Sequence, residues 1–507
     1  MRHSKVKKVK HKGQNRTMSQ AKPKKDWNPQ YVKYLLEPHF RQAEQHFLAP
    51  LLEVSRAHAL MLWQSGLLEL DHAKKICAAL ETVASETFTY SQNFEDLFFA
   101  LEARLLALAG TDAAGNLHIA RSRNDTDAAL IRMILRRETL EAIEVVTQIG
   151  VVLQTRALAG LTWLMPGYTH HQPAQPTTLG HYLSGILGVL ERDLQRLKAA
   201  YSSINLSPLG AVAMTGTGFA INRQSVADWL GFESLLENGI DAVGASDHSL
   251  ELLSALQICN TNLSRLVHDL IFWATQETGF FRVADSFVQI SSIMPQKRNP
   301  VVLEHIRAKL ARANGAAQTA FTMCHHIPFG DVNDVAEPLL PVVLSALEDS
   351  RAATGLLTAV LEISSFETAK MRHAAGKHFI TATGLADALV GVGLTFKTAH
   401  TIVSRTIDNA VQHSLEPTQL TAEIVQSMTE IRLELTDQFV QGALNPQNFV
   451  ERRTTLGGSA PSVVQVALEK AGLRLEQTKN WHSQKVQNLE MAQENLKTAV
   501  QNLLEQP

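Results

Sequence analysis

The stretch SDHSLELLSALQICNTNLSRLVHDLIFWATQET, residues 246–278, decides the fold class. It contains neither glycine nor proline, and apolar residues recur in it at helical spacing: Leu250, Leu253, Leu256, Leu263, Leu266, Leu270 and Trp273. A helix of this length would extend about 50 Å at 1.5 Å per residue. Such long helices are typical of bundles, because each needs neighbours on several sides to cover its apolar surface.

Three further segments have the same character, and together they predict an all-α protein. One runs from about residue 127 to 161 with glycines at 150 and 160, a second from Pro300 to about 326, and a third follows Pro338. Short β-branched runs do not alternate with helices, which argues against a Rossmann fold or a barrel. We expect three helical domains between two tails: a basic, disordered tail (1–25), an N-terminal domain (26–118), a central bundle (119–372), a C-terminal domain (373–478) and a polar helical tail, either an exposed helix or frayed (479–507).

The bulk composition excludes several classes of function. The formal net charge of −2 over 507 residues gives no support to nucleic acid as the main partner. The three cysteines, Cys77, Cys259 and Cys324, form no CxxC pair, which argues against disulfides and thiolate zinc sites and favours a reducing cytoplasm. We expect no membrane span, since no uninterrupted apolar stretch of about 20 residues occurs. The basic N-terminus lacks the apolar core of a signal peptide.

The segment SSIMPQKRNP, residues 291–300, is the most specific chemical signal. Pro295 and Pro300 exclude a continuous helix, so the segment is predicted to be a loop. Such a loop can present hydroxyls, backbone N–H groups and a cation to an anionic ligand. On composition alone, a plain connection between helices is an equal alternative.

Two other segments carry polar side chains that suit acid–base or carboxylate chemistry. LHIARSRND, residues 117–125, has two arginines that could clamp carboxylates, although it could equally be a solvated helix start capped by Asn124 or Asp125. GYTHHQPAQP, residues 167–176, has histidines that could transfer protons near neutral pH, or that could sit buried in a turn. Metal ligation is disfavoured, because the His-His pairs lack a matching carboxylate spacing.

In this order, the three segments resemble the signature segments of the argininosuccinate lyase family, within the aspartase/fumarase superfamily. SSIMPQKRNP resembles the superfamily signature, while the other two segments, SPLGAVAMTGTGFAINR and LGGSAP resemble the argininosuccinate branch. The resemblance implies three helical domains, a homotetramer with a 20-helix core, and active sites shared between subunits. It further implies β-elimination of an N-substituted aspartate to fumarate and an amine, without a cofactor, as in arginine biosynthesis.

The resemblance also implies a role for particular residues. Ser291 matches the general base, with Ser292 as its neighbour and rival. Lys297 matches a residue that stabilises the dianionic intermediate, and Asn299 shares that role. His170 matches the histidine that assists proton transfer to the leaving group, with Glu304 as its acidic partner. The matching substrate-binding positions are Ser122, Arg123, Asn124, Thr169, Gln296 and Asn299.

Several positions depart from the family pattern. Ile290 stands where the family usually has glycine, and Phe98 where it has a histidine. The segment DVNDVAEP, residues 331–338, lacks the tyrosine, lysine and glutamine that the family has there, in the region implied to hold the amine half of the substrate. We therefore expect either argininosuccinate or a different N-succinyl amine as the substrate, with preference for a smaller or less anionic amine.

Two alternative functions stay open at this point. One is another branch of the superfamily: adenylosuccinate lyase, aspartase or fumarase. The other is a non-catalytic, crystallin-like homologue, against which the retained Ser291, Lys297, Asn299 and His170 argue.

Overall fold

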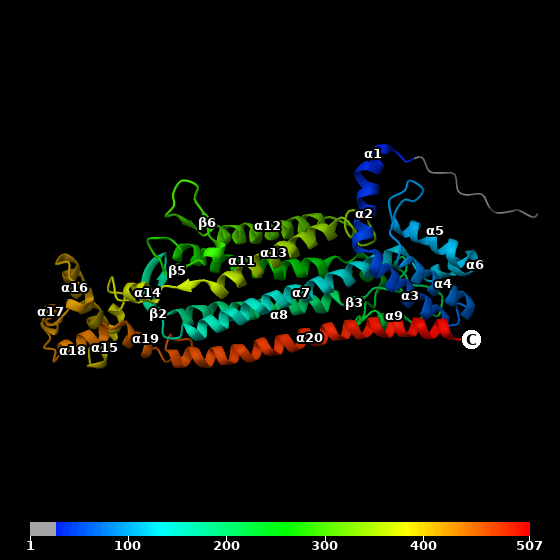
Figure 1. Ribbon diagram of the computed structural model, residues 1–507. Helices are drawn as coiled ribbons and strands as arrows, with labels where there is room; N and C mark the ends of the chain where they lie inside the picture. The colour runs from blue at the N-terminus through cyan, green and yellow to red at the C-terminus, as the bar shows by residue number, and fades with distance from the viewer. Residues whose placement is uncertain (1–26) are drawn as a thin grey trace, which may run out of the picture.

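The computed structural model describes residues 27–507, and the expected disordered tail at 1–25 lies outside the described residues. The chain forms an elongated helical molecule in which small helical regions cap the two ends of a long bundle (Figure 1). The all-α expectation is confirmed, with only short strands added.

The central bundle is built from long helices that pack side by side. Its members are α7 (Arg123–Ala159), α8 (Leu179–Ile204), α11 (Asp247–Trp273), α12 (Val301–Met323), α13 (Leu339–Ile363) and α20 (Pro461–Glu505). All four long helices expected from the sequence are present. α7 runs through Gly150 without a break. A Cβ at Gly150 would meet Leu475 at 2.8 Å and Leu190 at 3.5 Å. Glycine thus lets α8 and α20 approach α7 closely.

α7 is also apolar and long enough to cross a membrane by length and composition alone. In the structure it packs against α8, α13 and α20, so its apolar side chains belong to the bundle core.

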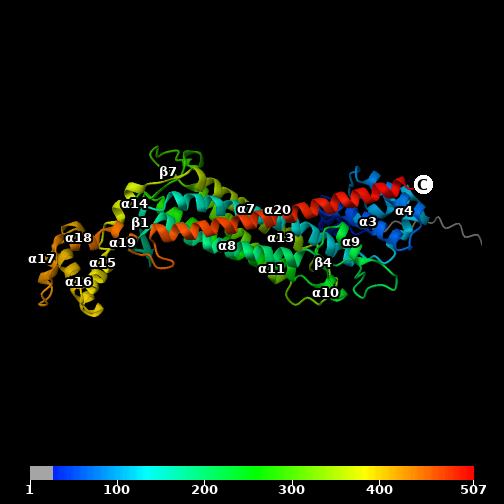
Figure 2. The same ribbon diagram turned by 90° about the horizontal axis from the view of Figure 1, so that it is seen from below.

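The N-terminal region shares its core with the bundle. Its elements are α1 (Pro29–Tyr31), η1 (Val32–Leu36), α2 (Glu37–His46), α3 (Leu48–Gln64), α4 (Leu70–Val83), α5 (Leu97–Ala109), α6 (Thr111–Ala114) and η2 (Gly115–His118). One continuous hydrophobic cluster extends from Phe47 in this region to Leu503 near the C-terminus. Short helices α9 (Arg223–Trp229) and α10 (Gly239–Gly244) lie at the same end of the molecule (Figure 2).

The opposite end carries a region with a core of its own, which includes Leu389, Ile402 and Val440. Its elements are α15 (Ala382–Gly391), α16 (Phe396–Gln412), η4 (Pro417–Gln419), α17 (Ala422–Ser427), α18 (Asp437–Leu444) and α19 (Pro446–Glu451). α14 (Thr368–Ala375) joins this region to the bundle and contacts β1.

The structure corrects the expected C-terminal division. The boundary at 478 falls inside α20, a single helix of 45 residues that runs along the bundle from one end region to the other (Figures 1 and 2). The last part of this helix is not frayed, because Leu496, Val500 and Leu503 are buried. These residues recur at helical spacing and form a narrow apolar stripe that faces α3 and α4. Because Gln, Asn and Lys lie between them, the composition of the segment is polar and does not indicate this stripe.

The strands are short and pair two by two. β1 (Leu164–Thr169) and β2 (Gln172–Thr178) form an antiparallel hairpin, β3 (Leu206–Ser207) and β4 (Ser234–Leu235) are parallel, and β5 (Phe281–Arg282) and β8 (Ser365–Phe366) are antiparallel. β6 (Gln289–Ile290) pairs antiparallel with β7 (Arg298–Asn299), and a 3-10 turn, η3 (Asp285–Phe287), precedes β6.

Candidate active site

The loop between β6 and β7 carries the serine, lysine and asparagine singled out in the sequence. Ser291 Oγ accepts the backbone N–H of Met294 at 3.1 Å and of Ile293 at 3.4 Å. These two bonds fix the Ser291 oxygen within the loop. The Asn299 amide donates to Gln289 O at 3.2 Å and ties the base of the loop together.

The side chains of Gln296 and Lys297 in this loop face solvent. Lys297 has no ion-pair partner among residues 27–507 of this chain, so its ammonium is available to an anion. Glu304, in the first turn of α12, is also exposed. Ser291 is partly buried, whereas the neighbouring Ser292 is exposed, and only Ser291 accepts the two backbone N–H groups described above.

Thr169 and His170 lie at the tip of the β1–β2 hairpin. Thr169 pairs with Gln172, which leaves His170 and His171 as a two-residue turn with φ of 52° and 60°. Such turns usually contain asparagine or glycine, because positive φ strains other residues. Because this turn has neither asparagine nor glycine, the sequence does not predict the hairpin. The strained turn holds the His170 ring out from the bundle, where it is exposed.

Aromatic contacts seat this hairpin on the C-terminal end of α11. The His171 ring lies 6.2 Å from that of His268, and Tyr168 lies 5.6 Å from Phe272. Gln175 also donates to Thr383 Oγ1 at 3.0 Å, in the neighbouring end region. The hairpin is therefore fixed relative to the bundle.

Ser122, Arg123 and Asn124 lie at the start of α7. Ser122 caps this helix in a capping box, with Asn124 N–H donating to Ser122 Oγ at 3.3 Å and Ser122 N–H donating to Asp125 Oδ1 at 3.2 Å. The Asn124 amide donates to Ala213 O at 3.3 Å. The helix start and the candidate ligand-binding segment are thus the same structure, so the two sequence interpretations do not exclude each other.

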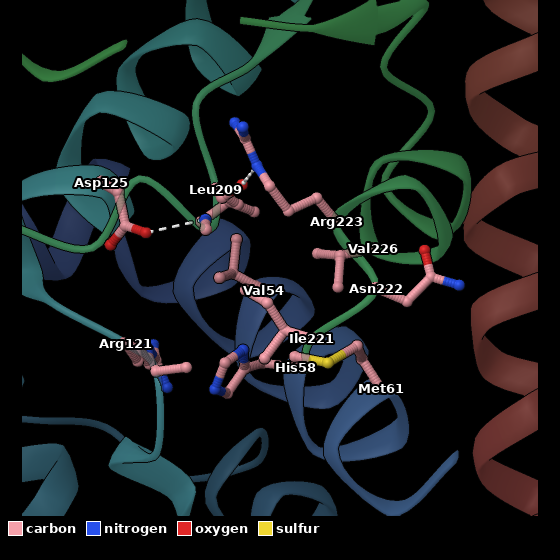
Figure 3. A pocket seen from close by; sticks show the side chains of 12 residues that line it. Val54, His58, Met61, Arg121, Asp125, Leu209, Ile221, Asn222, Arg223 and Val226 are labelled. Atoms are coloured by element: carbon pink, nitrogen blue, oxygen red, sulfur yellow. Dashed lines mark hydrogen bonds between the residues drawn. The ribbon is translucent and has the colours of Figure 1, made fainter. Parts of the chain in front are cut away.

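A small pocket lies beside this segment, and hydrogen bonds around the pocket hold the segment in place (Figure 3). Asp125 Oδ2 accepts the N–H groups of Gly210 and Val212, each at 2.9 Å. His58 Nε2 lies 2.9 Å from Ile119 O, and burial lowers the pKa of His58 to about 3, so a neutral ring donates this bond. Burial also lowers the pKa of Arg121 to about 10, which leaves it charged at neutral pH.

Arg123 belongs to a cluster of charges that the sequence did not reveal. Its guanidinium lies 2.7 Å from Asp96 and 4.0 Å from Asp127, and it stands over the ring of Phe98 at 5.6 Å. Although burial disfavours its charged form, the Asp96 and Asp127 carboxylates raise the pKa of Arg123. Phe98, which replaces the family's histidine, therefore contributes a cation–π contact.

The acids of this cluster outnumber its cations. Burial, with the nearby carboxylates of Glu337, Asp331 and Asp96, raises the pKa of Asp127 to about 8 against the opposing charge of Arg123. Burial also raises the pKa of Glu337, whose carboxylate lies 3.7 Å from His39 Nδ1. These residues are far apart in sequence, and no local pattern brings them together.

One chain does not bring the three candidate segments together. Asn124 lines a pocket with Ser246, which precedes α11, whereas the His170 hairpin packs on the last turns of α11. A helix of 27 residues separates these positions by roughly 40 Å. The Ser291 loop follows α11 and precedes α12, so it lies at the hairpin end (Figure 1). Among the described residues, no ion pair joins His170 to Glu304 within the chain.

Within residues 27–507, no group of three His, Cys, Asp or Glu side chains has a geometry that could hold a metal ion.

Comparison with known proteins places the chain in a family. The family model described as Lyase matches residues 41–315, and the one described as Argininosuccinate lyase C-terminal matches residues 379–451. Argininosuccinate lyase 1 of Shouchella clausii is 36% identical over 469 residues, covering 91% of this chain and 93% of the relative. Argininosuccinate lyase of Methanothrix thermoacetophila is 37% identical over 424 residues, covering 83% and 87%.

A solved lyase structure has the same fold. The crystal structure of EDDS lyase in complex with formate superposes with a TM-score of 0.84 at 31% identity, covering 92% of this chain and 94% of that one. The relatives favour the argininosuccinate branch over the other branches of the superfamily. The chain belongs to the argininosuccinate lyase family of the aspartase/fumarase superfamily, and it is a carbon–nitrogen lyase.

Proposed function

We propose that the chain cleaves the carbon–nitrogen bond of an N-substituted aspartate by β-elimination, releasing fumarate and an amine. The observation that carries this proposal is the environment of Ser291. Its oxygen accepts two backbone N–H groups in a loop that also presents Lys297 and Asn299. A serine is a weak base unless its alkoxide is stabilised, and fixed donors and a nearby cation supply that stabilisation.

In the proposed reaction, the Ser291 oxygen removes a proton from Cβ of the substrate. The electron pair of the C–H bond first spreads into the adjacent carboxylate, giving an intermediate with a second negative charge on that group. The Lys297 ammonium and the Asn299 amide stabilise this charge, which is the main barrier to the reaction. The pair then forms the C=C bond as the C–N bond breaks, and the nitrogen leaves as an amine.

The leaving nitrogen receives its proton from His170, with Glu304 of another subunit orienting the ring. Thr169 and Gln296 bind the substrate from the hairpin and the serine loop. Ser122, Arg123 and Asn124 bind it from the start of α7, mainly on the succinyl half. Arg123 already pairs with Asp96 and Asp127, so these carboxylates weaken its attraction for a substrate carboxylate.

A homotetramer is part of the proposal. The start of α7 lies roughly 40 Å from the His170 hairpin in one chain, so a working site needs segments from different subunits. The bundle helices of four chains would form the 20-helix core, with each site assembled where subunits meet. The cytoplasm is the proposed compartment, since Cys77, Cys259 and Cys324 are free thiols.

A test of the function follows fumarate absorbance with a panel of N-substituted aspartates that includes argininosuccinate and N-succinyl amines without an α-amino-acid half. We expect fumarate from at least one member, and its consumption when the matching amine is added to fumarate. No change in fumarate with any member in either direction would refute the proposed function.

A further inference from the structure

A small pocket adjoins the start of α7. Three parts of the chain line it: α7, the junction of α10 and α11, and the loop that leads into α13. Its polar lining residues are Asn124, Asp127, Ser246, His248, Ser249 and Asp331. Asn124 belongs both to this pocket and to the segment proposed to bind the succinyl half, so the pocket continues from the reaction site.

His248 is the unusual member of this lining. Its side chain is only 8% exposed, and neither ring nitrogen has a hydrogen-bond partner among the described residues. Burial, reinforced by the charge of Arg132, lowers the pKa of His248 well below its ordinary value, so the ring is neutral. A buried imidazole without partners costs free energy, which a ligand that donates a hydrogen bond to it would recover.

The same pocket has an excess of carboxylates. Asp127 and Asp331 line it directly, and Glu337 and Asp96 lie close enough to perturb Asp127. The cations that face these acids from the surrounding elements are Arg123 and, when it is protonated, His39. Burial and this crowding keep a proton on Asp127 near neutral pH. A cationic group bound there would favour release of that proton, whereas an anionic group would be repelled by the remaining charges.

A close backbone contact fixes the loop that carries Asp331. A Cβ added at Gly244, the last residue of α10, would lie 2.6 Å from Gly330 N and 3.1 Å from Phe329 C. Only glycine therefore allows the loop that carries Asp331 to approach α10 so closely. The backbone packing therefore fixes this wall of the pocket.

We propose that this pocket binds a second ammonium group on the amine half of the substrate, so that the released amine is a short diamine without an α-carboxylate. The proposal rests on the proposed function and names its substrate class. An ammonium has three donors, and the pocket lining offers as acceptors Asp331, one nitrogen of His248, and Asp127 once it has released its proton. An α-carboxylate at the same place would face two acids and no free cation.

The test runs the reaction toward addition, with fumarate and either 1,3-diaminopropane or n-propylamine. The two probes differ by one terminal ammonium group. We expect kcat/KM to be about tenfold or more higher for the diamine, and Asp331→Asn to remove most of that preference. Asp334→Asn is the matched control, because Asp334 is exposed on the same loop but does not line the pocket. It should keep the preference.

Calorimetric titration with 1,3-diaminopropane separates this inference from the reaction itself. Binding should weaken in Asp331→Asn and also in His248→Phe, a change that breaks no hydrogen bond within the chain. Diamine binding without a change in fumarate for any member of the panel would support the pocket and refute the proposed function. Equal reaction of both probes, or diamine binding unchanged in both variants, would refute the inference and leave the proposed function standing.

Discussion

Arg123 Nη1 lies 2.7 Å from Asp96 Oδ2, and this ion pair joins the starts of two helices. The other oxygen of Asp96 accepts the N–H of Phe99 at 3.1 Å and caps α5. Arg123 is the first residue of α7. One carboxylate therefore begins one helix and holds the guanidinium at the beginning of the other.

Substitutions at Asp96 should separate these two roles. Asp96→Asn keeps a good helix cap but removes the charge, so we expect an unchanged melting temperature and a KM raised about tenfold as Arg123 loses its orientation. Asp96→Ala removes the cap as well and should lower stability by a further ~1 kcal/mol. Thermal melting and steady-state kinetics of the two variants measure the roles. Equal KM values for Asp96→Asn and the wild type would show that the ion pair does not position Arg123.

Ser291→Ala should abolish turnover while binding persists. Removing a general base typically costs about 10²- to 10⁴-fold in kcat, because the base acts in the transition state and not in ground-state binding. Single-turnover kinetics gives the rate, and titration with fumarate gives the affinity. Ser292→Ala is the control, since only the Ser291 hydroxyl accepts the loop N–H groups. If Ser292→Ala were the inactive variant, the role of base would pass to Ser292.

Mixed oligomers should recover activity that neither parent has. Ser291 and Asn124 lie at opposite ends of α11 within one chain, so the proposed sites take them from different subunits. Inactive Ser291→Ala and Asn124→Ala proteins, denatured and refolded together, should form some sites with both residues intact. Each protein refolded alone is the control. An inactive mixture would mean that every chain contributes both residues to the same site.

The stability of the protein should depend on Asp127 over a defined pH range. The unfolded chain releases this proton near pH 4, whereas burial keeps it bound in the folded chain up to about pH 8. A raised carboxyl pKa destabilises the fold as pH rises through that window. Asp127→Asn should therefore gain in melting temperature, relative to the wild type, from pH 4 to pH 8 and then level off. Asp334→Asn should show no such trend, and a gain that shrinks with pH would contradict the assignment.

Gly244→Ala should disturb the pocket rather than the bundle. Its new Cβ would displace backbone atoms of Gly330 and Phe329, so we expect the loop to move and diamine selectivity to fall about tenfold. Gly391→Ala is a matched control, because Gly391 also ends a helix but has no atom within 4 Å of its Cβ position. Selectivity kinetics decides the matter, and unchanged selectivity in Gly244→Ala would mean that the loop tolerates the methyl group.

The long helices were predictable because their signal is local. Residues 246–278 lack glycine and proline and keep helical spacing, and α11 occupies Asp247–Trp273. The hairpin at 164–178 was not predicted, because its turn is His170–His171 and not a glycine pair. The end of α20 was also missed, since a narrow apolar stripe such as Leu496 and Val500 is masked by polar neighbours.

In the candidate site, too, local motifs were predictable from the sequence and contacts between distant residues were not. The segments at 122–124 and 291–299 were recognisable as motifs, and their roles remain predictions. The acid cluster was not recognisable, because Asp96, Asp127 and Glu337 meet only after folding. The sequence around His248 predicts only a histidine on a helix. That both ring nitrogens lack hydrogen-bond partners depends on tertiary packing, which no local pattern encodes.

The course of α20 has a consequence for how the protein is made. Leu503 is completely buried in the same cluster as Leu60 and Leu80, and Lys74 donates a hydrogen bond to Gln506 O. The core around α3 and α4 is thus incomplete until α20, which ends only at Glu505, has been synthesised. Domains usually fold in the order of synthesis, but here the apolar faces of α3 and α4 that pack on α20 stay uncovered until that helix has been made.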